Sequence, residues 1–175
     1  MDIRSMDRVL LEEKLNRLKA EDERVRSGRE AAINWIRERL ERELRADIAA
    51  RFGLDDAQWR QFELGEEPAF TSAESKLLGF LRLTSSKARQ YRAIASQGSR
   101  AAAGWLWKEL VEHELRRLPA RTEGEQRIPD VTWWRFLRLK VYSSAELAGK
   151  IAAALGLDAA EAAELGALFL RDVFE

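Results

Sequence analysis

The chain has 175 residues, with 30 Lys and Arg against 30 Asp and Glu, one His and no Cys. The lack of cysteine excludes disulfides, thiolate zinc sites, iron–sulfur clusters and cysteine nucleophiles, and a single histidine excludes multi-histidine metal sites. No apolar run approaches the ~18 residues of a membrane helix, and the charged start MDIRSMDRV is unlike a signal peptide. We therefore expect a cytoplasmic protein of one domain that does not cross a membrane.

Helix-start signals recur along the chain and predict an all-α fold. A capping box places Ser, Thr or Asp three residues before Glu or Gln, so that the two side chains satisfy orphan amides of the first turn. Five such boxes are present: Ser27/Glu30, Asp55/Gln58, Thr71/Glu74, Ser143/Glu146 and Asp158/Glu161. No segment shows sustained period-two alternation, the pattern that would indicate strands.

These signals, with glycines at the expected helix ends, define the predicted elements. Helices are predicted over 5–26, 28–52, 56–64, 72–83, 85–96, 99–118, 131–141, 144–155 and 159–173. We expect a single-domain helical bundle of about eight helices, with a long N-terminal helical hairpin or arm. Its parts are an N-terminal helix or arm over 1–26, a helical core with a basic centre over 27–118, and C-terminal helices over 129–175.

The first predicted helix carries an apolar stripe at heptad spacing. Leu11, Leu15, Leu18 and Val25 follow this spacing, with Asp22 in the intervening slot. The stripe covers only about two heptads, fewer than a long coiled coil needs. Two interpretations stay open: an amphipathic helix packed on its own domain, or a seam for a second copy or a partner helix.

One ten-residue segment occurs twice. Residues 48–57 read IAARFGLDDA and residues 151–160 read IAAALGLDAA, and the two segments share seven of ten positions. Each places a glycine between two predicted helices, where a left-handed residue ends the first helix. We interpret the pair as two uses of one helix–Gly–helix corner, not as a repeat protein.

The first corner has the pattern of a helix-turn-helix. Gly53 supplies the turn, and apolar residues precede it and follow it at one, six and nine positions. Residues 45–83, including the continuation Glu63-Leu64-Gly65-Glu66-Glu67-Pro68, resemble the Cro/C1-type repressor family. The resemblance implies that the second helix presents polar side chains to base edges in the major groove. The positions concerned are Gln58, Arg60 and Gln61, among acidic neighbours that oppose phosphate binding.

The middle of the chain is strongly basic. Residues 75–108 contain no acid and seven basic residues: Lys76, Arg82, Lys87, Arg89, Arg92, Arg100 and Lys108. On the predicted 85–96 helix, serines and arginines at 85, 89, 92 and 96 share one face, beside a packing stripe at 88, 91 and 95. The alternative is that these cations pair with acids elsewhere in the chain or in a partner protein. The candidate nucleic-acid or anion-binding residues are Arg60, Gln61, Arg82, Lys87, Arg89, Arg92 and Arg100.

No catalytic, metal or cofactor motif is present, so we expect a non-enzymatic protein without cofactors. His113 is predicted to be a surface residue of a helix, and at least one of the adjacent Trp133 and Trp134 is expected to be exposed. The first hypothesis is nucleic-acid binding or nucleoprotein assembly through the basic centre and the corner. The alternative is a protein-interaction adaptor or subunit that binds, or self-associates, through the N-terminal helix and Trp-bearing faces.

Overall fold

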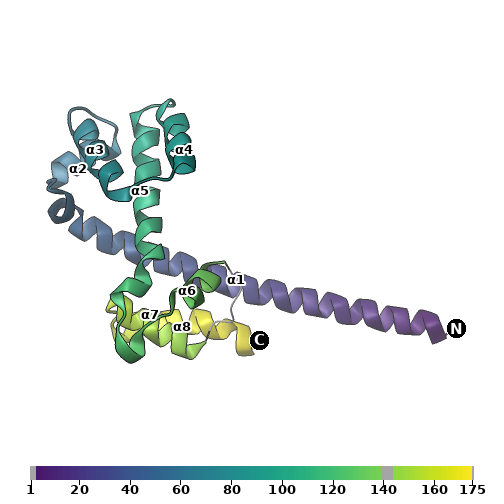
Figure 1. Ribbon diagram of the computed structural model, residues 1–175. Helices are drawn as coiled ribbons and strands as arrows, with labels where there is room; N and C mark the ends of the chain where they lie inside the picture. Colours follow the sequence, from purple (N-terminus) through teal and green to yellow (C-terminus); the bar gives the residue numbers. More distant parts are fainter. Residues whose placement is uncertain (1–2, 139–143, 175) are drawn as a thin grey trace. The chain divides into compact units, whose positions relative to one another are not determined.

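The computed structural model describes residues 3–138 and 144–174, and every regular element in these ranges is helical (Figure 1). The predicted all-α class is confirmed. Among these residues, no helix combines the length and apolarity that a bilayer span requires. The helices are α1 Ile3–Phe52, α2 Asp56–Glu63, α3 Ala69–Leu81, α4 Ser85–Ala95, α5 Ser99–Arg116, η1 Leu118–Arg121, η2 Gly124–Gln126, α6 Asp130–Leu137, α7 Ala145–Leu155 and α8 Ala159–Phe174.

The N-terminal segment is one continuous helix, not a hairpin. α1 runs through the predicted break at the Ser27/Glu30 capping box, so the prediction of two helices over 5–26 and 28–52 is wrong. A glycine inside a helix costs only about 1 kcal/mol, whereas proline, which would break it, is absent from this segment. Beyond Gly28, buried residues at Ile36, Leu40, Leu44 and Ile48 repeat every four positions, and their packing outweighs that cost.

The chain forms two compact units, and α1 contributes residues to both. We call Ile36–Arg117 the central unit, and the described residues up to Trp35 and from Leu118 onward the terminal unit. In the central unit, α2, α3 and α4 pack against α5 (Figure 1). Its core is apolar and includes the fully buried Phe62, Leu77, Leu106 and Leu110. Burial of this surface is the main term that stabilises the unit.

Both copies of the repeated segment form the predicted corner. Gly53 and Gly156 each end a helix in the left-handed conformation, with φ of 63° and 60°. In each case an aspartate two residues later caps the next helix, which supports the interpretation as one corner used twice. The Gln58 amide donates to Asp55 Oδ1 at 2.7 Å, and the Glu161 amide donates to Asp158 Oδ1 at 2.8 Å.

The start of α3 differs from the prediction. The Thr71/Glu74 capping box is wrong, because α3 begins at Ala69, two residues before Thr71. The carboxylate of Glu67 takes the role expected of a cap: it accepts from the Thr71 hydroxyl at 2.6 Å and from the Thr71 amide at 3.3 Å. The predicted cap Ser143 lies outside the described residues, and Ser144 caps α7 by accepting from the Leu147 amide at 3.1 Å.

The terminal unit has an aromatic core. The Phe136 ring stacks on Trp133 at 5.4 Å and on Phe169 at 5.5 Å between centroids. α7 and α8 lie side by side in this unit (Figure 1). The adjacent tryptophans of α6 separate as expected, since Trp133 is buried and Trp134 is exposed.

Candidate nucleic-acid interface

The arginines of α4 lie on one exposed face of the helix. Ser85, Arg89, Arg92 and Ser96 are all exposed, as their spacing predicted. Thr84 caps the helix by accepting from the Lys87 amide at 3.3 Å. The neighbouring stripe packs inward, with Tyr91 buried and hydrogen-bonded to Glu74. Burial and this hydrogen bond both raise the pKa of Tyr91, so the phenol stays neutral and anchors α4.

Within the described residues, eight exposed arginines of the central unit make no ion pair or side-chain hydrogen bond: Arg42, Arg60, Arg82, Arg89, Arg92, Arg100, Arg116 and Arg117. Five of them lie between α2 and the first turn of α5, and we call these five the unpaired arginines: Arg60, Arg82, Arg89, Arg92 and Arg100. Other arginines of the same unit do pair with acids; Arg51 Nη1, for example, lies 2.7 Å from Glu114 Oε1. The unit thus neutralises part of its positive charge, whereas the guanidinium groups of the unpaired arginines face the solvent.

Lys87 differs from the other candidates because its charge is neutralised inside the unit. Its Nζ donates to Glu109 Oε1 at 2.7 Å, and Glu109 is buried. The same ammonium lies 5.9 Å from the centre of the Trp105 ring. This ion pair joins α4 to α5, and removing either partner would leave a poorly solvated charge. Because Glu109 already neutralises the charge of Lys87, Lys87 contributes little to an external site.

Sequence reasoning missed one further candidate, Lys108. It is exposed, and it makes no ion pair or side-chain hydrogen bond to any residue that the structure describes. Arg100, Gly104 and Lys108 follow each other at four-residue spacing and form an exposed stripe of α5. The four-residue spacing from Arg100 is the sequence signal that could have identified Lys108. Lys76, in contrast, donates from Nζ to the Phe52 carbonyl at 3.0 Å and caps the end of α1.

At the first corner, around Gly53, two of the three residues expected to read bases are exposed and uncommitted. Leu54, Trp59 and Phe62 are buried, as the pattern predicted. Arg60 and Gln61 are exposed on α2. Gln58 is committed to the capping box, because its Oε1 accepts from the Asp55 amide at 3.0 Å.

Gly65 joins the corner to the basic segment. It follows α2 with φ of +73°, and a Cβ built on it would lie 2.5 Å from the Arg100 amide nitrogen and 2.8 Å from the Ser99 carbonyl carbon. Only glycine permits this approach of two backbones. The end of α2 therefore rests on the first turn of α5, where Arg100 emerges.

His113 is largely buried, not a surface residue as predicted. Its side chain is 17% exposed, and its ring lies 4.9 Å from that of Phe80. Nδ1 has no hydrogen-bond partner within the described residues. Burial lowers the pKa of His113 below its usual 6.5, an effect that nearby Glu114 opposes and Arg117 reinforces. This environment is that of a packed core residue facing an aromatic ring.

We expect His113 to make the central unit less stable in acid. The folded state keeps the ring neutral, whereas the unfolded chain takes up a proton as the pH falls through 6.5. The free energy of unfolding therefore has its full value above that pH and decreases as the pH falls further. The decrease ends below the lower pKa that His113 has in the folded state. Urea unfolding of the wild type and of His113→Phe between pH 8 and 5 measures this. The variant should lose less stability on acidification, and equal losses would contradict the prediction.

The chain was compared with protein-family models, with curated proteins and with solved structures, and none of these comparisons gave a match. The side chains of the central unit are therefore the basis for a function. Their common chemistry is a set of exposed, planar guanidinium groups, which suits oxyanions such as phosphates.

Proposed function

We propose that the protein is a non-enzymatic nucleic-acid-binding protein, which contacts phosphates through the unpaired arginines of its central unit. The observation that carries this proposal is that these five exposed side chains have no acid partner in the described structure, although neighbouring arginines do. A zero net charge does not oppose it, because the acids are concentrated elsewhere in the chain.

Arginine is the side chain best suited to this role. Its planar guanidinium group donates two parallel hydrogen bonds to a phosphate and stays charged at all physiological pH values. Each phosphate neutralised releases counterions, so affinity comes largely from the number of such contacts and falls steeply with salt. If all five arginines contact duplex DNA, the slope of log K against log salt is about −4.5.

In this proposal the corner supplies sequence preference. Arg60 and Gln61 point to solvent from α2 and carry the donors and acceptors that read base edges. The acids around them are partly occupied: Asp55 caps α2, and Glu63 Oε1 lies 3.7 Å from Arg45 Nη1. The resemblance to Cro/C1-type repressors supports this assignment of roles, with α2 as the helix in the major groove.

The test is fluorescence anisotropy with labelled duplex and single-stranded DNA at several salt concentrations. We expect R89E/R92E to weaken binding roughly 60-fold at 0.1 M salt. Two lost phosphate contacts remove about 1.8 from the slope of log K against log salt, which is a factor of about 60 over the decade from about 1 M to 0.1 M. The exchange should leave unfolding within about 0.5 kcal/mol per site, since both residues are exposed. R60A/Q61A should reduce discrimination between DNA sequences more than it reduces overall affinity.

The matched control is R42E/R127E. It makes the same change of net charge at two exposed arginines outside α4, one in each unit. Binding by the control should stay near the wild-type value. If the control weakens binding as much as R89E/R92E, the effect is one of net charge and the proposed site is wrong. Wild-type protein that binds neither DNA nor RNA at low salt overturns the proposal.

A second candidate function, a protein-interaction adaptor, is favoured by a different surface. On α6, Val131 and Trp134 are exposed on one face, and the Arg138 guanidinium lies 3.7 Å from the centre of the Trp134 ring. Exposed tryptophan stacked with arginine is typical of the anchors of protein interfaces. An adaptor of this kind would bind its partner with little salt dependence and would lose it on Trp134→Ala.

A further inference from the structure

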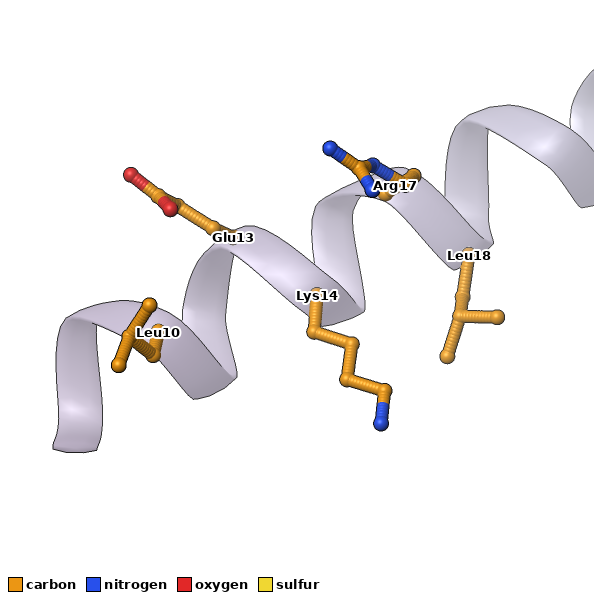
Figure 2. Close-up of a pocket in the computed structure, with 5 residues that line it drawn as sticks. All are labelled: Leu10, Glu13, Lys14, Arg17 and Leu18. Carbon is orange, nitrogen blue, oxygen red and sulfur yellow. The ribbon is translucent and has the colours of Figure 1, made fainter.

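The start of α1 exposes large apolar side chains in a row. Leu11 is 67% exposed, Leu15 51% and Leu18 54%, and Val9 and Leu10 are exposed as well. A close-up of this segment shows Lys14 and Leu18 pointing to one side of the helix, and Glu13 and Arg17 to the other (Figure 2). All residues from 9 to 21 with a described side chain are exposed, so nothing in the described chain covers this leucine stripe.

The leucine stripe has the geometry of a short coiled-coil seam. Leu11, Leu15 and Leu18 are separated by four and three residues, the alternation of the two core positions of a heptad. In this frame Glu12 and Lys19 flank the seam on one side, and Lys14 and Glu21 flank it on the other. Flanking residues at these positions set the orientation of the two helices, through the charges that they bring together.

The flanking charges favour a second copy in antiparallel orientation. When Leu15 of one copy packs beside Leu18 of the other, Glu12 of each copy lies beside Lys19 of the other. On the opposite flank, Lys14 of each copy then lies beside Glu21 of the other. All four interhelical pairs are attractive. In a parallel dimer the same frame brings Lys14 of one copy beside Lys19 of the other, which is repulsive.

From this complementarity we infer that two copies of the chain associate through residues 9–21 of α1, packed antiparallel along the leucine stripe. The inference goes beyond the proposed function and depends on a different part of the molecule, since the unpaired arginines all lie in the central unit. A dimer would also double the number of arginines available to a nucleic acid, a use of symmetry that is common in DNA-binding proteins. R89E/R92E should leave dimer formation unchanged.

Sedimentation equilibrium over a range of concentrations tests the inference on the full chain. Wild-type protein should approach twice the mass of the 20.1 kDa chain as its concentration rises. Leu15→Glu should abolish this increase. Lys19→Glu should raise the dissociation constant about tenfold, because two attractive pairs with Glu12 become repulsive. Glu12→Lys should do the same, and the double variant E12K/K19E should restore association.

The charge exchange distinguishes the two orientations by the sign of the effect. In a parallel dimer, Lys19→Glu would remove the repulsion from Lys14 and strengthen association. An equimolar mixture of Glu12→Lys and Lys19→Glu chains should form mixed antiparallel dimers, because every pair on that flank is then attractive. The matched controls Glu13→Lys and Arg17→Glu change charges on the outer side of the helix and should leave the dissociation constant unchanged (Figure 2).

Three results would overturn the inference. A chain that stays monomeric at every concentration has no self-complementary stripe. Stronger association of Lys19→Glu shows the parallel arrangement. If the protein is monomeric and binds anionic phospholipid vesicles, and if Leu15→Glu abolishes that binding, the leucine stripe contacts a membrane surface and not a second copy. Circular dichroism of each variant confirms that its helical content is retained.

Discussion

Replacing Phe62 with alanine is expected to lower the free energy of unfolding of the central unit by about 3–5 kcal/mol. Phe62 is fully buried in α2, and its ring lies 4.8 Å from that of Trp59 and 5.8 Å from that of Phe70. The substitution removes the buried ring and leaves a cavity that the neighbouring aromatic rings cannot fill without losing their own packing. Since a domain of this size has only about 5–15 kcal/mol of stability, the loss is a large fraction of the total.

Urea unfolding followed by circular dichroism and by tryptophan fluorescence measures this loss. Phe80→Ala is the matched control, because Phe80 is 39% exposed, although its ring also contacts Phe52 at 5.5 Å and His113 at 4.9 Å between centroids. The control should cost markedly less than Phe62→Ala, since a half-exposed ring removes less surface from water. Equal costs for the two variants would show that α2 is not anchored through Phe62.

Gly65→Ala is expected to destabilise the central unit by about 3 kcal/mol and to weaken nucleic-acid binding together with stability. Two costs add: about 1 kcal/mol for a Cβ at positive φ, and about 1–3 kcal/mol for the clash with its surroundings. The new Cβ would lie 2.5 Å from the Arg100 amide nitrogen, a backbone atom that cannot rotate away. The loop after α2 and the first turn of α5 must therefore separate, which displaces Arg100 relative to the corner.

Gly53→Ala is the control that separates the cost of a positive φ from the cost of the close contact at Gly65. Gly53 has φ of +63°, close to that of Gly65, but a Cβ there would meet only the flexible Lys76 Nζ, at 3.8 Å. Gly53→Ala should therefore lower the free energy of unfolding by only about 1 kcal/mol, which is the cost of placing a Cβ at positive φ. Thermal and urea unfolding of both variants, with binding assays below the unfolding transition, give the comparison. A Gly65→Ala variant no less stable than Gly53→Ala would contradict the close approach of the two segments.

The exposed face of α4 was predictable because its contacts are local. Four-residue spacing assigns Ser85, Arg89, Arg92 and Ser96 to one side of a helix, and no distant segment is needed to place Tyr91 on the other. The two corners were predictable for the same reason, since Gly53 and Asp55 act on their own neighbours. Local sequence signals were therefore enough to predict the all-helical class, the two corners and the exposed face of α4.

Which charges stay unpaired depends on tertiary contacts. Lys87 and Arg89 belong to the same basic segment, but Glu109 of α5 neutralises Lys87 and has no counterpart for Arg89. The helix break expected at Gly28 was wrong because burial of Ile36 and Leu40, a non-local term, outweighs a local preference of about 1 kcal/mol. The approach of Gly65 to Arg100 spans 35 residues of sequence and follows from how α2 and α5 pack. Local signals fix backbone conformation residue by residue, whereas ion pairs and close approaches depend on which segments folding brings together.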